Sequence, residues 1–437
     1  MKTNEEAIKM RKRNMKIFPL YKALAWDYLF YYTIDFIFFT QVKNMSAATV
    51  ILKESFYSFF SIITQIPANI IIGFLGRRNS IILGNVLNCL YMVIVMLSRN
   101  LGDLIFAEFI CAIAFSIKDS AQPSLLSESI PPSRYKSTIY SKISAKGASM
   151  YYLFNAISKI FAGFLFTING YLPIVCALAI LILTTILSIG FIEPVKKSKV
   201  KPDIVLGKQQ IKETKDGFIY ILKSDRLKAL ILCAALISTL LNIASSYHVS
   251  LLEDLSVSSV AIGIIAAVGS FVSAYASKKH DEFHNKRRNK SLLTIAFMLS
   301  VSCLIAGIFG KISEKYMIFI AIVVSMTIIY NFCQGMYYTL IDKYLSNFAN
   351  KHIDTKIFSA QQLFTNILKT IGGVFSAFLI DRFITAYCMI IMGILFTILY
   401  ILVGKYMKTR VGLKPEQYSK EEKKYDEQKL LEENVLK

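Results

Sequence analysis

The chain has 437 residues, of which 54% are apolar and 18% charged, and its mean hydropathy is +0.49. A soluble domain has about 45–50% apolar and about 25% charged residues, so the composition argues against an ordinary soluble domain and favours a protein that faces lipid. The net charge of +21 would indicate a nucleic-acid partner in a soluble protein, an interpretation that depends on where the charges lie.

The N-terminal residues 1–18 are basic and polar, and the apolar stretch after them contains charges and has no small-residue cleavage site. We therefore expect a cytoplasmic tail rather than a secretory signal. Beyond it, apolar segments of about 20 residues recur, the length that a helix needs to cross about 30 Å of hydrocarbon. Twelve spans are predicted, at residues 19–41, 48–72, 80–98, 104–127, 144–168, 171–192, 228–252, 259–277, 291–310, 316–341, 357–380 and 384–406.

A charged connection at residues 195–227, longer than any other loop, separates the sixth span from the seventh. It divides the chain into one six-helix bundle at residues 19–194 and a second at residues 228–406, followed by a cytoplasmic tail at residues 407–437. The sequence therefore predicts an all-α integral membrane fold, with twelve transmembrane helices in two six-helix bundles.

The distribution of Lys and Arg tests this topology, because loops rich in these residues are retained in the cytoplasm. With the N-terminus inside, 38 of the 50 Lys and Arg residues lie in inner segments or at the inner ends of the adjoining spans, and five lie in outer loops. The charge is thus a signal of topology, which predicts a multi-pass protein of the cell membrane with both termini in the cytoplasm. It gives no indication of a nucleic-acid partner.

The cysteines and histidines offer little material for catalysis. Seven cysteines lie singly inside apolar runs without a CxxC pair, and the four histidines form no HExxH or Ser/His/Asp pattern. We expect free thiols, no metal site, no cofactor and no enzymatic activity. No Walker loop GxxxxGK[ST] is present, so an ion gradient is the expected source of energy.

The loop between the second and third spans contains a recognisable motif, Pro67-Ala-Asn-Ile-Ile-Ile-Gly73-Phe-Leu-Gly76-Arg77-Arg78. It resembles P-x-G-x-L-A-D-R-x-G-R-R, the signature loop of the major facilitator superfamily of secondary transporters. Asn69 replaces the first glycine of the signature and Gly73 replaces its aspartate. The fourth span, at residues 112–128, is similar to that of several efflux-type members, and the sixth span ends in Glu193-Pro194, another recurrent feature.

The resemblance implies a transporter that works by alternating access, with the first and fourth helices of each half lining a central cavity. In the family, the aspartate of the signature loop takes part in a charge network that latches one conformation. Gly73, Gly76, Arg77 and Arg78 are therefore expected to form a gate loop. Asp281, in the corresponding loop of the second half, is a candidate for the missing acid.

The first span contains two carboxylates and a phenol, Asp27, Tyr31 and Asp35, spaced four residues apart. On a continuous helix this spacing places them along one face. Since an ionisable side chain inside a membrane costs about 2.5–3.5 kcal/mol on insertion scales, we expect them to face a cavity and to bind a proton or a cation. A seam of hydrogen bonds between helices is the alternative.

The fourth span adds Glu108, Lys118, Asp119 and Gln122. Eleven residues make about three helical turns, so Glu108 and Asp119 are expected to share a face, with Lys118 about 100° away. The two acids are candidates for proton coupling, and Lys118 and Gln122 for the substrate cavity. A structural ion pair between Lys118 and an acid is the alternative.

Polar candidates for the cavity in the second half are Asn242, Asn331 and Gln334. Lys159 and Lys369 occupy corresponding positions in the fifth and eleventh spans, as in a duplicated bundle. Each lysine is expected either to contact an anionic substrate or to extend its amine to the interface. Lys53 and Glu54, at the start of the second span, are interpreted as an interfacial pair.

These features favour a transporter of a small solute, driven by protons, with efflux of amphipathic or drug-like compounds as the leading hypothesis. Uptake of a small anionic or polar solute is the alternative, and a non-transporting membrane receptor or assembly factor is a further one. The expected partners are the solute, protons or another coupling ion, and the lipid bilayer, and we expect a monomer.

Overall fold

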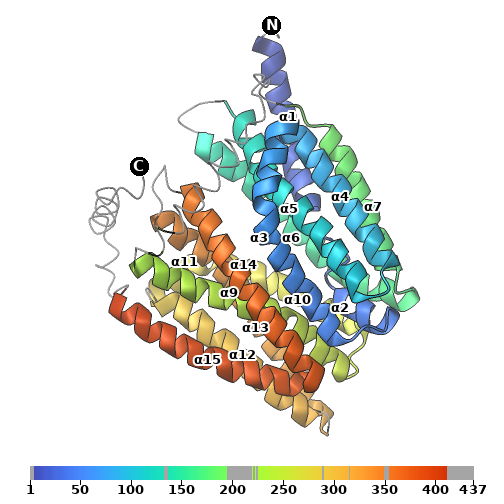
Figure 1. Ribbon diagram of the computed structural model, residues 1–437, viewed down its shortest axis with the longest axis vertical. Coiled ribbons are helices and arrows are strands. Elements are labelled where there is room, and N and C mark those ends of the chain that lie inside the picture. The colour runs from blue at the N-terminus through green and yellow to red at the C-terminus, as the bar shows by residue number, and fades with distance from the viewer. Residues whose placement is uncertain are drawn as a thin grey trace. The chain divides into compact units, whose positions relative to one another are not determined.

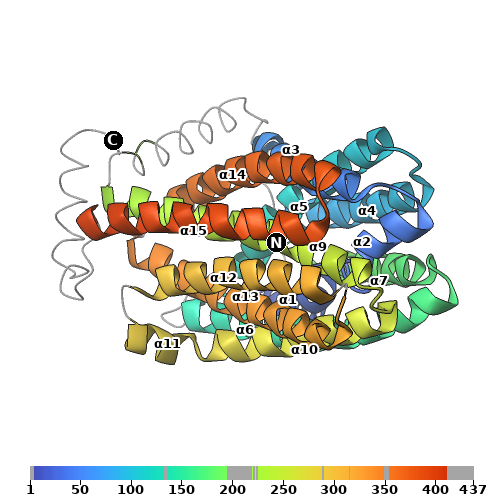
Figure 2. The ribbon, with the colours of Figure 1, turned by 90° about the horizontal axis from the view of Figure 1, so that it is seen from below.

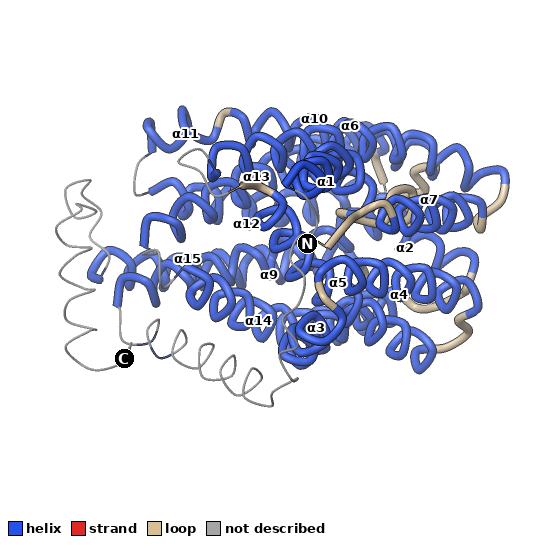
Figure 3. The backbone as a smooth tube through the Cα atoms, turned by 90° about the horizontal axis from the view of Figure 1, so that it is seen from above, coloured by secondary structure: helices blue, strands red, loops and turns tan. Residues whose placement is uncertain are grey.

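The computed structural model describes residues 4–131, 136–193, 219, 222, 225–287, 290–313, 315–348 and 354–410. These residues form helices joined by short loops, with no strand among them (Figure 3). All seven cysteines are free thiols, as the sequence predicts.

The helices of the first half follow in order along the chain (Figure 1). They are α1 (Asn4–Ala25), α2 (Asp35–Ile37), the short π-helix η1 (Phe38–Val42), α3 (Ala47–Leu75), α4 (Arg77–Leu97), α5 (Leu101–Ser129), α6 (Lys136–Ile168) and α7 (Leu172–Ile189).

The second half begins after the central connection, most of which lies outside the described residues. Its helices are α9 (Asp225–Asp254), α10 (Ser259–Lys278), α11 (His280–Arg287), α12 (Ser291–Ser313), the 3-10 helix η3 (Met317–Phe319), α13 (Ile320–Phe348), α14 (Asp354–Arg382) and α15 (Thr385–Arg410). The C-terminal tail predicted at residues 407–437 lies outside the described part of the chain beyond residue 410.

Nine of the described helices are long and apolar enough to cross a membrane, and α3 makes ten if its two parts count as one span. The parts of α3 meet at Pro67 with a bend of 53°, since proline removes a backbone hydrogen bond and clashes with the preceding turn. Of the other two predicted spans, residues 104–127 fall within α5, and residues 19–41 overlap only the end of α1 before continuing through α2 and into η1. The first ends as a helix at Ala25, and charged and polar side chains interrupt the apolar sequence of α5.

The chain forms two compact units. Unit 1 comprises Met1–Met45, Phe56–Lys208 and Ser259–Ala267, and unit 2 comprises Ser46–Ser55, Gln209–Ser258 and Val268–Lys437. Within unit 1, α4 packs against α5 and α7, and α1 packs against α6. Within unit 2, α12 packs against α13 and α15, and α9 packs against α14 and α15 (Figure 2). The first turns of α3 therefore pack with unit 2, and the first turns of α10 pack with unit 1.

Candidate functional site

The first helix ends inside the predicted first span, and another helix supplies a partner for its last carbonyl. Lys118 of α5 donates a hydrogen bond from its ammonium to the carbonyl oxygen of Ala25, at 2.9 Å. The ammonium also lies 4.8 Å from the centre of the Phe115 ring. Lys118 is 1% exposed, so the fourth-span lysine serves α1 as a buried C-terminal cap.

The expectation that Asp27, Tyr31 and Asp35 share one helical face is wrong. Residues 26–34 are not helical, and Phe30 takes a left-handed conformation with φ of 70°. A helical period no longer relates the three side chains once the helix has ended. Asp35 begins the short α2 and is buried at 6% exposure.

Asp27 is held by a tyrosine from α6. Its Oδ2 accepts a hydrogen bond from the Tyr151 hydroxyl at 2.9 Å, and its Oδ1 accepts one from the backbone amide of Tyr28 at 2.9 Å. Asn155 in turn donates to the Tyr151 hydroxyl. Lys159, one turn further along α6, interacts with Asp27 through its charge. Lys159, the lysine of the first predicted repeat, is thus close enough to the Asp27 carboxylate to interact with it.

Glu108 lies at the end of a chain of phenols. The Tyr91 hydroxyl donates to Glu108 Oε1 at 3.1 Å and lies 3.3 Å from the Tyr31 hydroxyl. Glu108 is 3% exposed, and both tyrosines are buried. The structure therefore brings the predicted residues Tyr31 and Glu108 into one buried network, through Tyr91, a residue that the sequence pattern did not single out.

Asp119 differs from these acids because its side chain is exposed and forms no hydrogen bond with the described residues, although it interacts with Lys118 through its charge. It lines a cavity of about 230 Å³ within unit 1, between α1, α5 and α6. We call this the Asp119 cavity; its lining includes Lys22, Trp26, Asp119, Gln122, Tyr140 and Ser144.

The two cations closest to the Asp119 cavity are already engaged. Lys22 donates to the Ser144 hydroxyl at 2.6 Å, and its ammonium lies 4.6 Å from the centre of the Trp26 ring. Lys118 is committed to Ala25. Gln122 donates to the Tyr21 hydroxyl at 3.4 Å. The exposed carboxylate of Asp119 therefore remains for a bound solute, beside a Trp26 ring that Lys22 also contacts.

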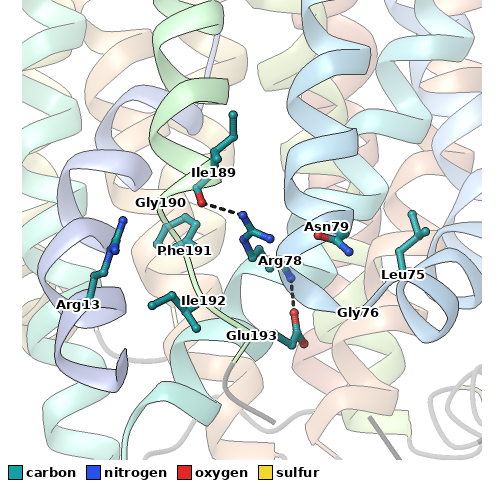
Figure 4. Close-up of a pocket in the computed structure, with 10 residues that line it drawn as sticks. All are labelled: Arg13, Leu75, Gly76, Arg78, Asn79, Ile189, Gly190, Phe191, Ile192 and Glu193. Atoms are coloured by element: carbon teal, nitrogen blue, oxygen red, sulfur yellow. Dashed lines mark hydrogen bonds between the residues drawn. The ribbon is translucent and has the colours of Figure 1, made fainter. Parts of the chain in front are cut away.

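The signature loop gains its acid from the end of the sixth span. Gly76 adopts φ of 81°, and the Glu193 carboxylate accepts hydrogen bonds from the backbone amides of Arg77 at 3.1 Å and Arg78 at 2.8 Å. Figure 4 shows this carboxylate at the first turn of α4. An acid at a helix N-terminus satisfies free amides and complements the helix dipole.

Arg77 also forms an ion pair with Glu128 of α5, and its guanidinium lies 4.0 Å from Glu193. Two acids of unit 1 thus surround the loop that has Gly73 in place of aspartate. Asp281 is exposed on α11, 3.3 Å from His280 Nε2, and its role in a latch stays a prediction.

Unit 2 contains an acid that the sequence analysis had assigned to the interface. Glu54 of α3 accepts hydrogen bonds from Ser246 at 2.9 Å and Asn242 at 3.4 Å, both on α9. Lys369 of α14 interacts with Glu54 through its charge. Lys53, which precedes Glu54 in the chain, is buried at 2% exposure. The signal in the sequence was a charged pair within the apolar second span. The partners of Glu54 lie too far along the chain to be inferred from that pattern.

The remaining candidates of the second half lie on α13. Asn331 donates to the Thr327 carbonyl oxygen at 2.8 Å, and its backbone oxygen accepts from Ser273 of α10 at 2.6 Å. Its side chain fills the space left by Gly269, where an added Cβ would approach within 2.6 Å. Asn331 therefore packs α13 against α10, while Gln334 is half-buried one turn away.

Comparisons with known proteins identify the architecture. A model of the Major Facilitator Superfamily matches residues 23–367. A search of the curated proteins finds no match. Among solved structures, a bacterial homologue of the human lysosomal transporter Spinster has a TM-score of 0.68 and 14% identity, over 92% of this chain and 98% of that one.

Two other solved structures show the same fold. The nucleoside transporter NupG has a TM-score of 0.67 and 12% identity, over 91% of this chain and 99% of that one. A D-xylose-proton symporter has a TM-score of 0.64 and 11% identity, over 91% of this chain and 97% of that one. With the family model, the membrane-spanning helices and these structures in agreement, the chain belongs to the major facilitator superfamily of transporters.

Proposed function

We propose that this transporter exports a small organic cation or basic amphipathic solute in exchange for protons, with Asp119 as the carboxylate that receives both. The observation that carries the proposal is the exposed Asp119 carboxylate beside the partly exposed Trp26 side chain in the Asp119 cavity.

The chemistry of the cavity favours a cation over an anion. Trp26 is 42% exposed and stacks against Tyr151 at 5.1 Å between ring centres, so its ring is held in place. An aromatic face beside a carboxylate attracts an organic cation through the ring quadrupole and through the opposite charge. Lys22 and Lys118 already donate hydrogen bonds within unit 1, so both lysines support the cavity.

Competition at one carboxylate provides the coupling. A carboxylate that binds either a proton or a solute cation must release one before it takes the other. When it alternates between the two sides of the membrane, the two ligands move in opposite directions, and an inward proton gradient drives export. Asp27 and Glu108, whose oxygens accept hydrogen bonds from tyrosine hydroxyls, are expected to hold the surrounding helices in place.

The test is transport of ethidium, a fluorescent organic cation, by the purified protein in proteoliposomes. We expect an imposed proton gradient to drive ethidium against its own gradient, and Asp119→Asn to abolish this movement. The matched control is Asp381→Asn, which removes a carboxylate from an exposed helix end of unit 2 and is expected to transport normally. Gradient-driven transport that persists in Asp119→Asn would remove Asp119 from the mechanism.

Proton exchange can be measured without flux. Addition of ethidium to the weakly buffered, detergent-solubilised protein is expected to release protons from the wild type and from Asp381→Asn, but not from Asp119→Asn. Binding without proton release would support a solute site and contradict the exchange mechanism.

A further inference from the structure

A second cavity of unit 1, unrelated to the Asp119 cavity, lies where α1, the start of α4 and the end of α7 meet. It has a volume of about 570 Å³. We call it the Arg13 pocket; its lining includes Arg13, Leu75, Arg78, Asn79, Ile189 and Glu193 (Figure 4). It contains both polar and apolar groups, and no step of the proposed transport cycle uses it.

The polar part of the Arg13 pocket has an uncommitted positive charge. Arg13 is exposed and forms no hydrogen bond or ion pair with the described residues. Its Nη2 atom lies 3.7 Å from the position that a Cβ of Gly190 would take, which places the guanidinium beside the end of α7. Arg78 reaches the same segment and donates from Nη2 to the Ile189 carbonyl oxygen at 2.9 Å.

The acid of the pocket offsets at most one of these two cations. Both oxygens of Glu193 accept hydrogen bonds from the backbone amides at the start of α4, and its charge also faces Arg77 at 4.0 Å. Two guanidinium groups therefore face the pocket beside a carboxylate that already has partners. Guanidinium groups bind phosphate oxygens with strong, charge-assisted hydrogen bonds.

The apolar part of the Arg13 pocket continues onto the outer surface of two transmembrane helices. Leu75 is 42% exposed and Ile189 is 54% exposed. Further along α7, Ile182, Leu183 and Ile186 are exposed on the same face as Ile189. In a membrane these side chains contact acyl chains. The pocket thus combines a cationic end with an apolar face that leads into the hydrocarbon.

Its position matches the level of phospholipid headgroups. Arg13 precedes the first span, Arg78 lies at the start of α4, and Ile189 is the last residue of α7. Arg78 and Ile189 therefore lie at helix ends, and Arg13 lies on α1 before the apolar stretch that begins at residue 19. The Lys and Arg distribution predicts this side to be cytoplasmic. Basic pockets between transmembrane helices on that side suit anionic lipid headgroups.

We propose that the Arg13 pocket binds the phosphate headgroup of an anionic phospholipid from this leaflet, with Arg13 and Arg78 on the phosphate and the acyl chains along the exposed face of α7. A free phosphate compound has the same charged chemistry but gains nothing from the apolar face. The lipid is therefore the expected ligand.

The test uses the full chain, with phosphatidylglycerol as the anionic probe and phosphatidylcholine as the zwitterionic reference. Retained lipid is counted by native mass spectrometry, and the melting temperature is measured in nanodiscs of each lipid. We expect the wild type to retain phosphatidylglycerol preferentially and to melt at a higher temperature in it. Arg13→Gln is expected to weaken retention about tenfold, as for the loss of one charge-assisted contact to phosphate.

The control is Lys16→Gln, which removes the same charge from an exposed position of the same helix, outside the pocket lining. It is expected to retain phosphatidylglycerol like the wild type. Equal losses in Arg13→Gln and Lys16→Gln would overturn the proposal, because they would reflect general surface charge. Equal retention of the two lipids by the wild type would also overturn it. So would stabilisation by soluble glycerol 3-phosphate that matches that of phosphatidylglycerol, since the site would then bind phosphate without a lipid.

Discussion

The ammonium of Lys118 donates a hydrogen bond of 2.9 Å to the carbonyl oxygen of Ala25, the residue at which α1 ends. The last carbonyls of a helix lack partners within the helix and carry the negative end of its dipole. A buried cation supplies both a hydrogen-bond donor for these carbonyls and a positive charge for the helix end. The stem of Lys118 passes Gly84 of α4, where an added Cβ would lie 2.8 Å from Lys118 Cγ. One side chain of α5 thus joins α1 and α4.

Replacement of this lysine is expected to destabilise the protein. Lys118→Met keeps most of the apolar stem but leaves the Ala25 carbonyl oxygen without its donor, a change that costs about 1–3 kcal/mol. Thermal unfolding of the detergent-solubilised protein measures the effect as a lower melting temperature. Lys146→Met, at an exposed position of α6, is the control and is expected to melt like the wild type. A similar melting temperature for both variants would contradict the capping role of Lys118.

The same contact explains why the first span was predicted incorrectly while most others were placed well. The length of an apolar run reflects the thickness of the hydrocarbon layer, so spans such as residues 80–98 and 171–192 fall close to α4 and α7. The apolar run that starts at residue 19 also has the right length. Its helix ends early, at a carbonyl bound by a side chain 93 residues away, and no local pattern contains that contact.

The site residues likewise divide into those that the sequence indicates and those that only the structure shows. Asp27, Glu108 and Asp119 were identified because a charge inside an apolar run is costly and therefore conspicuous. The role of Glu193 was not predicted, since its partners are backbone amides 115 and 116 residues away and backbone amides leave no mark in a sequence. Tyrosines from other helices determine which of these acids accepts a hydrogen bond, so only the structure distinguishes Asp119 from Asp27.

Asn14 allows a second test of how single side chains stabilise unit 1. It lies in residues 1–18, which the sequence predicts to be a tail, and it binds two other segments of the chain. Its amide donates to Ser129 Oγ at 2.9 Å and to the Ile192 carbonyl oxygen at 2.7 Å, and it accepts from the Ile192 amide at 2.9 Å. Asn14→Ala removes these three hydrogen bonds, including both to the half-buried backbone of Ile192, and is expected to lower the stability by about 1–3 kcal/mol.

The matched control for this change is Lys12→Ala, at an exposed position two residues earlier on α1. Thermal unfolding of the two variants should differ clearly, with Lys12→Ala close to the wild type. If Asn14→Ala also melts like the wild type, the start of α1 does not contribute to the stability of unit 1.

The signature loop offers two glycines that should respond differently to the same new side chain. Gly73 is exposed, and a Cβ added there meets no atom within 4 Å. Gly73→Asp restores the acid of the family signature and is expected to change the stability by less than about 0.5 kcal/mol. Because Arg77 already pairs with Glu128 and lies close to Glu193, transport should also be unchanged.

Gly76→Asp places the same aspartate where the structure has no room for it. The backbone there has φ of 81°, and an added Cβ would lie 3.2 Å from the Glu193 carboxyl carbon. With ψ of 169°, this backbone conformation is adopted almost only by glycine and costs about 1–3 kcal/mol for other residues, and the two carboxylates repel each other. Melting temperatures of the two variants provide the comparison. Equal stability of Gly73→Asp and Gly76→Asp would show that Glu193 does not hold this turn.

The last prediction concerns Glu54 and Lys369 in unit 2, which a double-mutant cycle can test directly. Each of Glu54→Gln and Lys369→Met leaves one charge without its opposite, so each is expected to lower the melting temperature. The double variant should lose less than the sum of the two, with a coupling energy in the range of about 0.5–3 kcal/mol found for residues that interact. Lys290→Met, at an exposed position before α12, is the control partner, and its effect should add to that of Glu54→Gln. A cycle with no coupling between Glu54 and Lys369 would show that Lys369 does not balance the charge of Glu54, and the Asn242 and Ser246 hydrogen bonds would then be sufficient to hold the acid.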